Sequence, residues 1–116
     1  MILDVNLTIS DRQNTQGATL RSSITHILDS APAKDRDDAR CNGRLCDKIF
    51  NAELTVDLND EDLKRIKRAI DANKNMTCWA VEGLEYYLWP EELADSDRER
   101  LASRYSGGAI NAPEET

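Results

Sequence analysis

Apolar positions recur every three or four residues over much of this chain, the spacing that places them on one face of an α-helix. Leu20, Ile24, Ile27 and Leu28 form the first such stripe, and Pro32 bounds it. This pattern predicts a short helix over 18–30.

A second stripe, formed by Leu45, Cys46, Ile49 and Phe50, predicts a helix from about residue 36 to residue 52. Gly43 lies in its first half and predicts a break or frayed turn there, because glycine disfavours helix interiors.

The clearest helical signal lies in 54–89. Asn59 is a good N-cap, and the apolar residues Leu63, Ile66 and Ile70 follow it at helical spacing. After a polar turn, a second helix runs from about Thr77 to Trp89, where Pro90 stops it. We expect these two helices to pair antiparallel and to bury their stripes against each other.

Two short stretches alternate with period two, as half-buried strands do. They are Leu3–Ile9 and Leu54–Leu58, and they can pair if helices pack on them. The segment 11–17 between the first stretch and the first helix is polar and predicts a turn.

The predicted fold is therefore mostly α: a small single domain of four or five short helices with one or two short β-strands near Leu3–Ile9 and Leu54–Leu58. The domain spans 1–106, with 1–17 as a strand or arm. Ser96 and Glu99 predict a capping box for a last helix. The segment 107–116 predicts a disordered tail.

The net charge of −7 narrows the classes of partner. Acidic residues concentrate in 82–99, where Arg98 is the only base. Repulsion from phosphates makes direct nucleic-acid binding unfavourable, whereas a basic protein surface is a favourable partner. No apolar run is long enough to span a bilayer and no secretory signal is evident, so we expect a cytoplasmic protein without membrane contact.

Catalytic and metal chemistry find little support. The potential metal ligands are His26, Cys41, Cys46 and Cys78, but their spacing lacks the tight pairs typical of zinc sites. Small buried hydrophobic side chains are the more ordinary role of such cysteines. No nucleophile, base and orienting group can be assembled around His26, so we expect no enzyme activity, no metal and no cofactor.

A protein-interaction surface is the best-supported site. Four of the six aromatic residues lie on the 77–89 helix or at its end, beside the acidic run. Aromatic residues within a charged rim are typical of binding hot spots. Burial in the core is the favoured explanation of these residues, because a small domain needs every large apolar group. The candidate interface residues are Glu82, Glu85, Tyr86, Trp89, Glu91, Glu92 and Asp95.

The order of features from Leu45 to Trp89 resembles that of small helical proteins of unassigned function encoded by bacteriophages and prophages. It comprises Lys48-Ile49 at a helix end, Val56-Asp57-Leu58 in a turn, the basic run Leu63–Lys67 after an acidic helix start, and an aromatic helix before Pro90. The resemblance covers about 45 residues. It implies an origin in a phage or mobile element and action inside a bacterium, and it implies no functional residues.

Together these patterns predict a non-enzymatic, phage-type accessory protein that binds and modulates a host protein through an acidic helical surface. Inhibition is the favoured form of modulation, and a protein that handles nucleic acid is an example of the host partner. One alternative is a structural protein that self-associates into an oligomer, with the basic helix of one copy meeting the acidic run of another. A second alternative is a small zinc-stabilised interaction domain.

Overall fold

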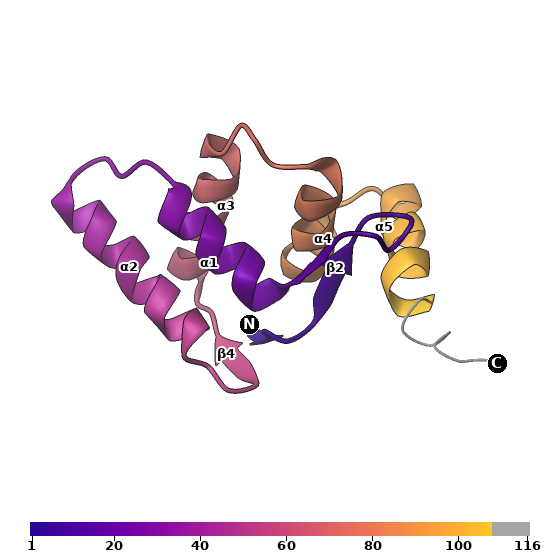
Figure 1. The fold of residues 1–116 in the computed structure, drawn as a ribbon, viewed down its shortest axis with the longest axis horizontal. Helices are drawn as coiled ribbons and strands as arrows, with labels where there is room; N and C mark the ends of the chain where they lie inside the picture. Colours follow the sequence, from indigo (N-terminus) through magenta and orange to yellow (C-terminus); the bar gives the residue numbers. More distant parts are fainter. Residues whose placement is uncertain (108–116) are drawn as a thin grey trace. The chain divides into compact units, whose positions relative to one another are not determined.

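The computed structural model describes residues 1–107, and it is mostly helical (Figure 1). Its described part contains five α-helices, two two-stranded sheets, a short 3₁₀ helix and a final π-helical turn. In chain order the elements are β1 (Ile2–Asp4), β2 (Thr8–Ser10), β3 (Gly17–Thr19), α1 (Leu20–Ser30), α2 (Arg36–Phe50), β4 (Thr55–Asp57), α3 (Asp60–Ala72), α4 (Cys78–Leu88), η1 (Pro90–Glu92), α5 (Asp95–Ala102) and η2 (Ser103–Gly107). The predicted mostly α fold with short strands is confirmed.

The chain divides into two compact units. Unit 1 consists of Met1–Thr8 and Ala18–Met76, and unit 2 consists of Ile9–Gly17 and Thr77–Thr116. The chain passes from unit 1 to unit 2 within β2, returns within β3, and enters unit 2 again before α4. The single domain predicted over 1–106 stays a prediction.

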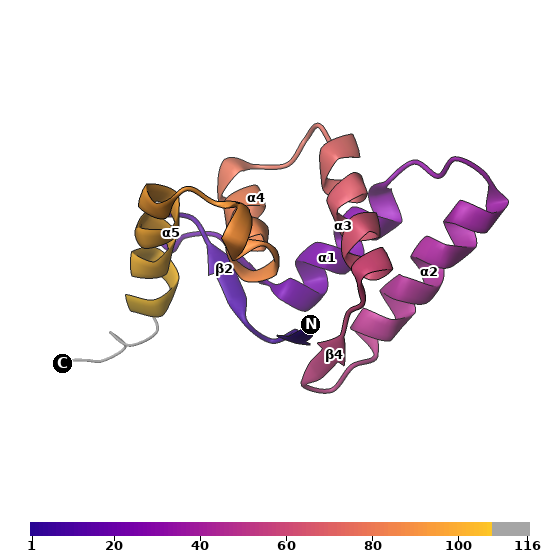
Figure 2. The ribbon, with the colours of Figure 1, turned by 180° about the vertical axis from the view of Figure 1, so that it is seen from behind.

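Helix α1 is the centre of unit 1, because both α2 and α3 pack against it (Figures 1 and 2). All four residues of its predicted apolar stripe are buried, from Leu20 to Leu28. The helix begins after Thr19, whose hydroxyl accepts a hydrogen bond from the Ser22 N–H at 3.1 Å. This cap satisfies one of the amide groups that a helix start leaves without a partner.

Strands β1 and β4 form an antiparallel pair in which Leu3 lies opposite Val56. Both of these side chains are buried, whereas Ile2 is 68% exposed, as the alternation of faces along a strand requires. The strand expected over 3–9 is interrupted after Asp4, whose carboxylate accepts from the Asn6 N–H at 2.9 Å. This local turn separates β1 from β2, so the pairing with 54–58 is confirmed for β1 alone.

Helix α2 is continuous through Gly43, so the predicted break there is wrong. A cap at its start supports this helix, since the Asp35 carboxylate accepts from the Asp38 N–H at 2.8 Å. Leu45, Cys46 and Ile49 are buried as predicted. Phe50 is not: it is the last helical residue, at the edge of the stripe, and its side chain is 65% exposed.

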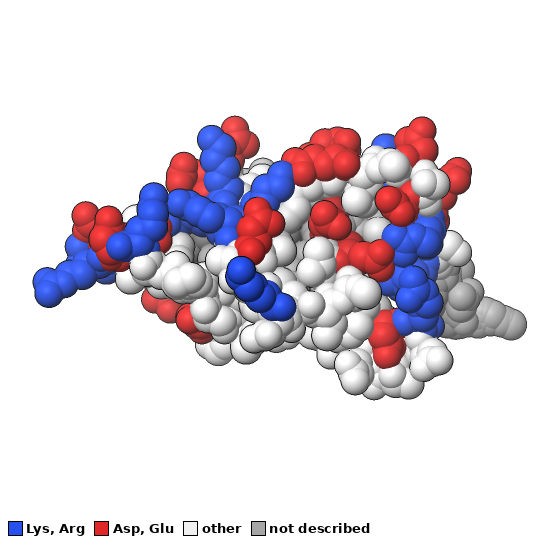
Figure 3. Space-filling view, turned by 90° about the horizontal axis from the view of Figure 1, so that it is seen from above, with Lys and Arg blue, Asp and Glu red and all other residues white. Residues whose placement is uncertain are grey.

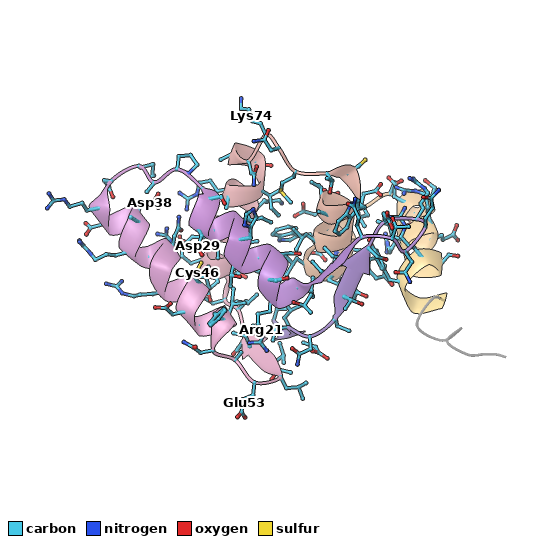
Figure 4. The ribbon with its side chains drawn as sticks, viewed as in Figure 1. Arg21, Asp29, Asp38, Cys46, Glu53 and Lys74 are labelled. Carbon is cyan, nitrogen blue, oxygen red and sulfur yellow. The ribbon has the colours of Figure 1, made fainter. Side chains whose placement is uncertain are left out.

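The Arg21 guanidinium holds the end of α2 (Figure 4). It donates to the carbonyl oxygens of Ile49 at 3.1 Å and Phe50 at 2.7 Å, and also to that of Ala52. Its second nitrogen donates to the Glu53 carbonyl oxygen at 3.2 Å. A single cation therefore satisfies the carbonyl groups that α2 and the following turn leave without helical partners.

Helix α3 begins with the predicted cap. The Asn59 side chain accepts from the Asp62 N–H at 2.8 Å, and the Asp62 carboxylate accepts from the Asn59 N–H at 3.1 Å. Within unit 1 this helix packs on α1. Helix α4 belongs to unit 2, so the antiparallel pairing predicted for the two helices stays a prediction.

Unit 2 is built from α4, η1, α5, η2 and the turn that joins β2 to β3. Pro90 ends α4 as predicted. Gly83 faces Ile9, and a Cβ built on Gly83 would lie only 2.5 Å from Ile9 Cγ2. The Tyr105 hydroxyl donates to the Ser10 carbonyl oxygen at 3.3 Å. Gly83 thus allows α4 to approach Ile9 closely.

The last helix starts differently from its prediction. The capping box at Ser96 is wrong, because α5 starts at Asp95 with Ala94 at the N-cap position and no side-chain cap bond. The predicted disordered tail at 107–116 lies outside the described residues except for Gly107. None of the helices within residues 1–107 is both long and apolar enough to cross a membrane.

Candidate interaction surfaces

Glu82, the first residue of the predicted acidic interface, is engaged inside unit 2. Its carboxylate accepts from Arg100 at 2.7 Å and from Arg104 at 3.2 Å, and its side chain is 24% exposed. These two guanidinium groups, Arg100 above all, lower the pKa of Glu82. Glu82 therefore ties α4 to α5 and η2, and it is not available as a contact for a partner.

The aromatic residues of the predicted interface are largely packed within their own unit. Trp89 is 7% exposed, so it cannot serve as an exposed anchor. Tyr86 is half-buried and lies edge-on to Tyr87, with ring centroids 5.0 Å apart. Tyr105 completes this cluster at 5.7 Å and 5.8 Å from the two rings. Burial raises the pKa of the Tyr87 hydroxyl. The core explanation for the aromatic residues is therefore the better one.

The exposed acids of unit 2 lie on η1 and α5 instead. We define the acidic surface by its four exposed residues: Glu91, Glu92, Asp95 and Glu99. Asp95 and Glu99 are four residues apart on α5 and so share one face of that helix. Asp95 pairs with Arg98 at 3.0 Å, but its side chain is 96% exposed and its carboxylate remains accessible. Glu85 of the predicted set is half-buried on α4.

The basic strip on α3, formed by Lys64, Arg65, Lys67 and Arg68, is only partly a solvated face. Arg65 is 16% exposed and donates to the Asp38 carboxylate at 2.7 Å and to the Asn42 side chain at 3.1 Å. These bonds join α3 to α2. The Lys34 N–H and the Arg65 guanidinium together lower the pKa of Asp38. Lys64 and Arg68 of the strip are exposed.

A second basic feature, on α2, was missed by the sequence reasoning. Arg36, Arg40, Arg44 and Lys48 recur every fourth residue and are all exposed, and we call them the α2 basic row. Figure 3 shows Lys and Arg side chains intermingled with acidic ones at the left, over the part of unit 1 that carries α2. The spacing of four residues is visible in the sequence and would have identified this row.

Lys48 and Arg44 also line an open groove of about 280 Å³ between α2 and the start of α3. The floor and opposite wall include Leu45, Glu61 and Arg65. Lys48 donates across it to the Asp62 carboxylate at 3.1 Å. The groove is thus mixed in charge, with Lys48 paired to Asp62 and Arg65 paired to Glu61.

The four candidate metal ligands are not gathered into a site. Cys46 is buried against α1, where its thiol donates to the Asp29 carboxylate at 3.3 Å (Figure 4). Burial, with Asp29 beside it, raises the pKa of Cys46 to about 12. Cys78 and His26 are exposed and Cys41 is half-buried. Among the described residues, no three potential metal-ligating side chains lie together.

The two units differ strongly in charge. Unit 1 contains eleven bases and twelve acids, a net charge of −1, whereas unit 2 contains four bases and ten acids, a net charge of −6. The net charge of the chain therefore resides almost entirely in the unit that carries the acidic surface.

Comparison with known proteins adds no family. No protein-family model, curated protein or solved structure matches the chain.

Proposed function

We propose that this chain is a non-enzymatic accessory protein that binds a host protein through the acidic surface and inhibits it. The observation that supports this most directly is the set of exposed carboxylates on η1 and α5, in a unit of net charge −6. Arg98 pairs with Asp95, Arg100 with Glu82 and Asp97, and Arg104 with Glu82. With four bases against ten acids, the unit keeps an excess of negative charge that favours a basic partner.

The partner is expected to carry a basic surface, such as one that normally holds nucleic acid. Electrostatic complementarity of this kind speeds encounter and selects the partner, and it weakens with salt. An inhibitor could work by covering that surface. The resemblance to small phage and prophage proteins supports a bacterial host and a cytoplasmic place of action.

A pull-down from nuclease-treated bacterial lysate tests this function. Three tagged forms are compared: the natural chain, an acidic-surface variant Glu91→Gln/Glu92→Gln/Glu99→Gln, and a control variant Asp47→Asn/Glu53→Gln/Asp71→Asn. The control removes three exposed carboxylates from unit 1 and so matches the change in net charge.

We expect one host protein to be retained by the natural chain and the control and lost from the acidic-surface variant. With the purified partner, neutralising three carboxylates should weaken binding at least tenfold, or about 1.4 kcal/mol. Equal recovery with all three forms would refute this choice of surface.

A further inference from the structure

The α2 basic row is a regular linear array of cations. Residues four apart on an α-helix are neighbours about 6 Å apart along the axis, so the row extends over about 18 Å and winds by about 120° around the helix. All four side chains are exposed, from Arg36 near the start of the helix to Lys48 near its end. The buried residues of α2, Leu45, Cys46 and Ile49, occupy other positions.

Unit 1 neutralises only half of this row. Arg40 pairs with Asp37, and Lys48 pairs with Asp62 at 3.1 Å. Arg36 and Arg44 form no ion pair with any described residue. Arg44 instead approaches the Cys41 sulfur at 3.9 Å. Two guanidinium groups, eight residues apart, are thus left to an anionic partner.

The acidic surface of unit 2 has the matching charge and the matching spacing. Asp95 and Glu99 on α5 repeat at the same interval of about 6 Å as the cations of the α2 basic row. Glu91 and Glu92 precede them on η1. The two acids of α5, one helical turn apart, can therefore lie along two successive cations of the α2 basic row.

We propose that the protein self-associates head to tail, with the acidic surface of one copy docked on the α2 basic row of a second copy. This inference extends the proposed function, because it names a further partner for the acidic surface. The two surfaces differ, so the contact is heterologous, and repeating it produces an open chain or a ring of copies.

Nucleic acid is the other anionic partner to consider for this row. The acids along α2, Asp37 and Asp47, are exposed beside the cations, and a continuous phosphate backbone would pass close to them. The chain also carries a net charge of −7, which repels a polyanion at long range. A short patch of carboxylates on a protein surface can avoid Asp37 and Asp47, and it carries less negative charge to be repelled than a polyanion does.

The first measurement is the molar mass of the purified full chain by light scattering at increasing protein concentration, in about 20 mM and about 500 mM NaCl. We expect the mass to rise above the 13.1 kDa of one chain at low salt and to return to it at high salt. A mass of one chain at all concentrations in low salt would overturn the proposal.

A mixing experiment then tests the two surfaces together. The row variant Arg36→Gln/Arg40→Gln/Arg44→Gln keeps its acidic surface, and the variant Glu91→Gln/Glu92→Gln/Glu99→Gln keeps its basic row. Each should remain a single chain alone, and an equimolar mixture should form a species of two chains that grows no further. Larger assemblies cannot form because each copy has only one functional surface. A mixture that stays at the mass of single chains would contradict the proposal.

A matched control separates the row from a general effect of charge. Lys34→Gln/Lys64→Gln/Lys74→Gln removes three exposed cations of unit 1 outside the row. This control should assemble as the natural chain does, and its failure to do so would refute the assignment to α2. Salt-sensitive binding of a labelled 20-nucleotide DNA, lost only in the row variant, would assign the row to nucleic acid and also overturn the proposal.

The result is separable from the test of the proposed function. The row variant keeps the acidic surface, so it should still retain the host protein in the pull-down. Loss of self-association in that variant together with retained host binding would support both inferences. Retained host binding with a single-chain natural protein would overturn self-association alone.

Discussion

The replacement Gly83→Ala is expected to destabilise unit 2 although alanine favours helices. The added Cβ would lie 2.5 Å from Ile9 Cγ2, 2.7 Å from its Cβ and 3.1 Å from its Cδ1. Ile9 is fully buried, and two of these three contacts are shorter than side chains tolerate. Ile9 would therefore have to move away from α4.

Two effects of opposite sign decide the outcome. Alanine in place of glycine inside a helix gains about 0.8–1 kcal/mol from propensity. Forcing an extra carbon into a filled core costs about 1–3 kcal/mol. Because the contact with Ile9 involves the branched part of a buried side chain, we take the upper part of this range and expect a net loss of about 1–2 kcal/mol.

Gly43→Ala is the matched control, since nothing lies within 4 Å of the Cβ position and the site is exposed in the middle of α2. It should stabilise the chain by about 0.5–1 kcal/mol. Urea unfolding followed by circular dichroism measures both variants. A loss of about 1 kcal/mol lowers the midpoint by up to about 1 M. A Gly83→Ala variant as stable as Gly43→Ala would refute the close approach of Gly83 to Ile9.

Three further predictions follow from the contacts inside each unit. Arg21→Met should destabilise the chain by about 2 kcal/mol in urea unfolding, because the carbonyl groups at the end of α2 lose their donor. Arg21→Lys should restore only part of this loss. A Met variant as stable as the natural chain would contradict the role of Arg21. Glu82→Gln should destabilise unit 2 by about 1 kcal/mol at neutral pH, measured by the fluorescence of its two tryptophans. Because folding lowers the pKa of Glu82, its contribution to the free energy of unfolding is present above the ordinary pKa of 4.5 and is lost as the pH falls through the lowered pKa. The difference in stability between the natural chain and the variant should therefore shrink in acid. A difference that stays constant with pH would argue against the ion pairs. Iodoacetamide at pH 8 should label the exposed Cys78 in the native protein and spare Cys46, because burial raises the pKa of Cys46 to about 12. Mass spectrometry of the peptides measures the labelling. Labelling of Cys46 in the native protein as fast as in urea would show that the thiol is not buried.

The fold was predictable where local signals decide it. The stripe from Leu20 to Leu28 and the cap at Asn59 depend on residues three or four apart, and both are confirmed. The break at Gly43 was wrong because a glycine in a helix costs only about 1 kcal/mol, which the Asp35 cap and the buried stripe that follows outweigh. The division of 3–9 into β1 and β2 depends on a turn at Asn6 that strand periodicity does not reveal.

The candidate site was predicted in part, and the errors share a cause. Counting acids in 82–99 against Arg98 omitted Arg100 and Arg104, which lie just beyond the counted window and reach back to Glu82. Linear charge counts cannot register such contacts between elements. Trp89 was listed as an interface candidate, but it follows the last residue of α4 and is buried.

The same reasoning explains why the α2 basic row was overlooked. The segment 35–48 contains four bases and four acids, so its net charge is zero and composition does not reveal the row. Every fourth residue from Arg36 is a base, and two of the acids, Asp35 and Asp38, accept from backbone groups at the start of the helix. The other two acids, Asp37 and Asp47, are exposed beside the bases. An acidic chain can therefore present a basic face without any change in its net charge. Together with the acidic surface of unit 2, the α2 basic row gives one molecule two surfaces of opposite charge, which heterologous self-association by charge requires. Because salt screens the attraction between such surfaces, the salt dependence of the molar mass tests the contact directly.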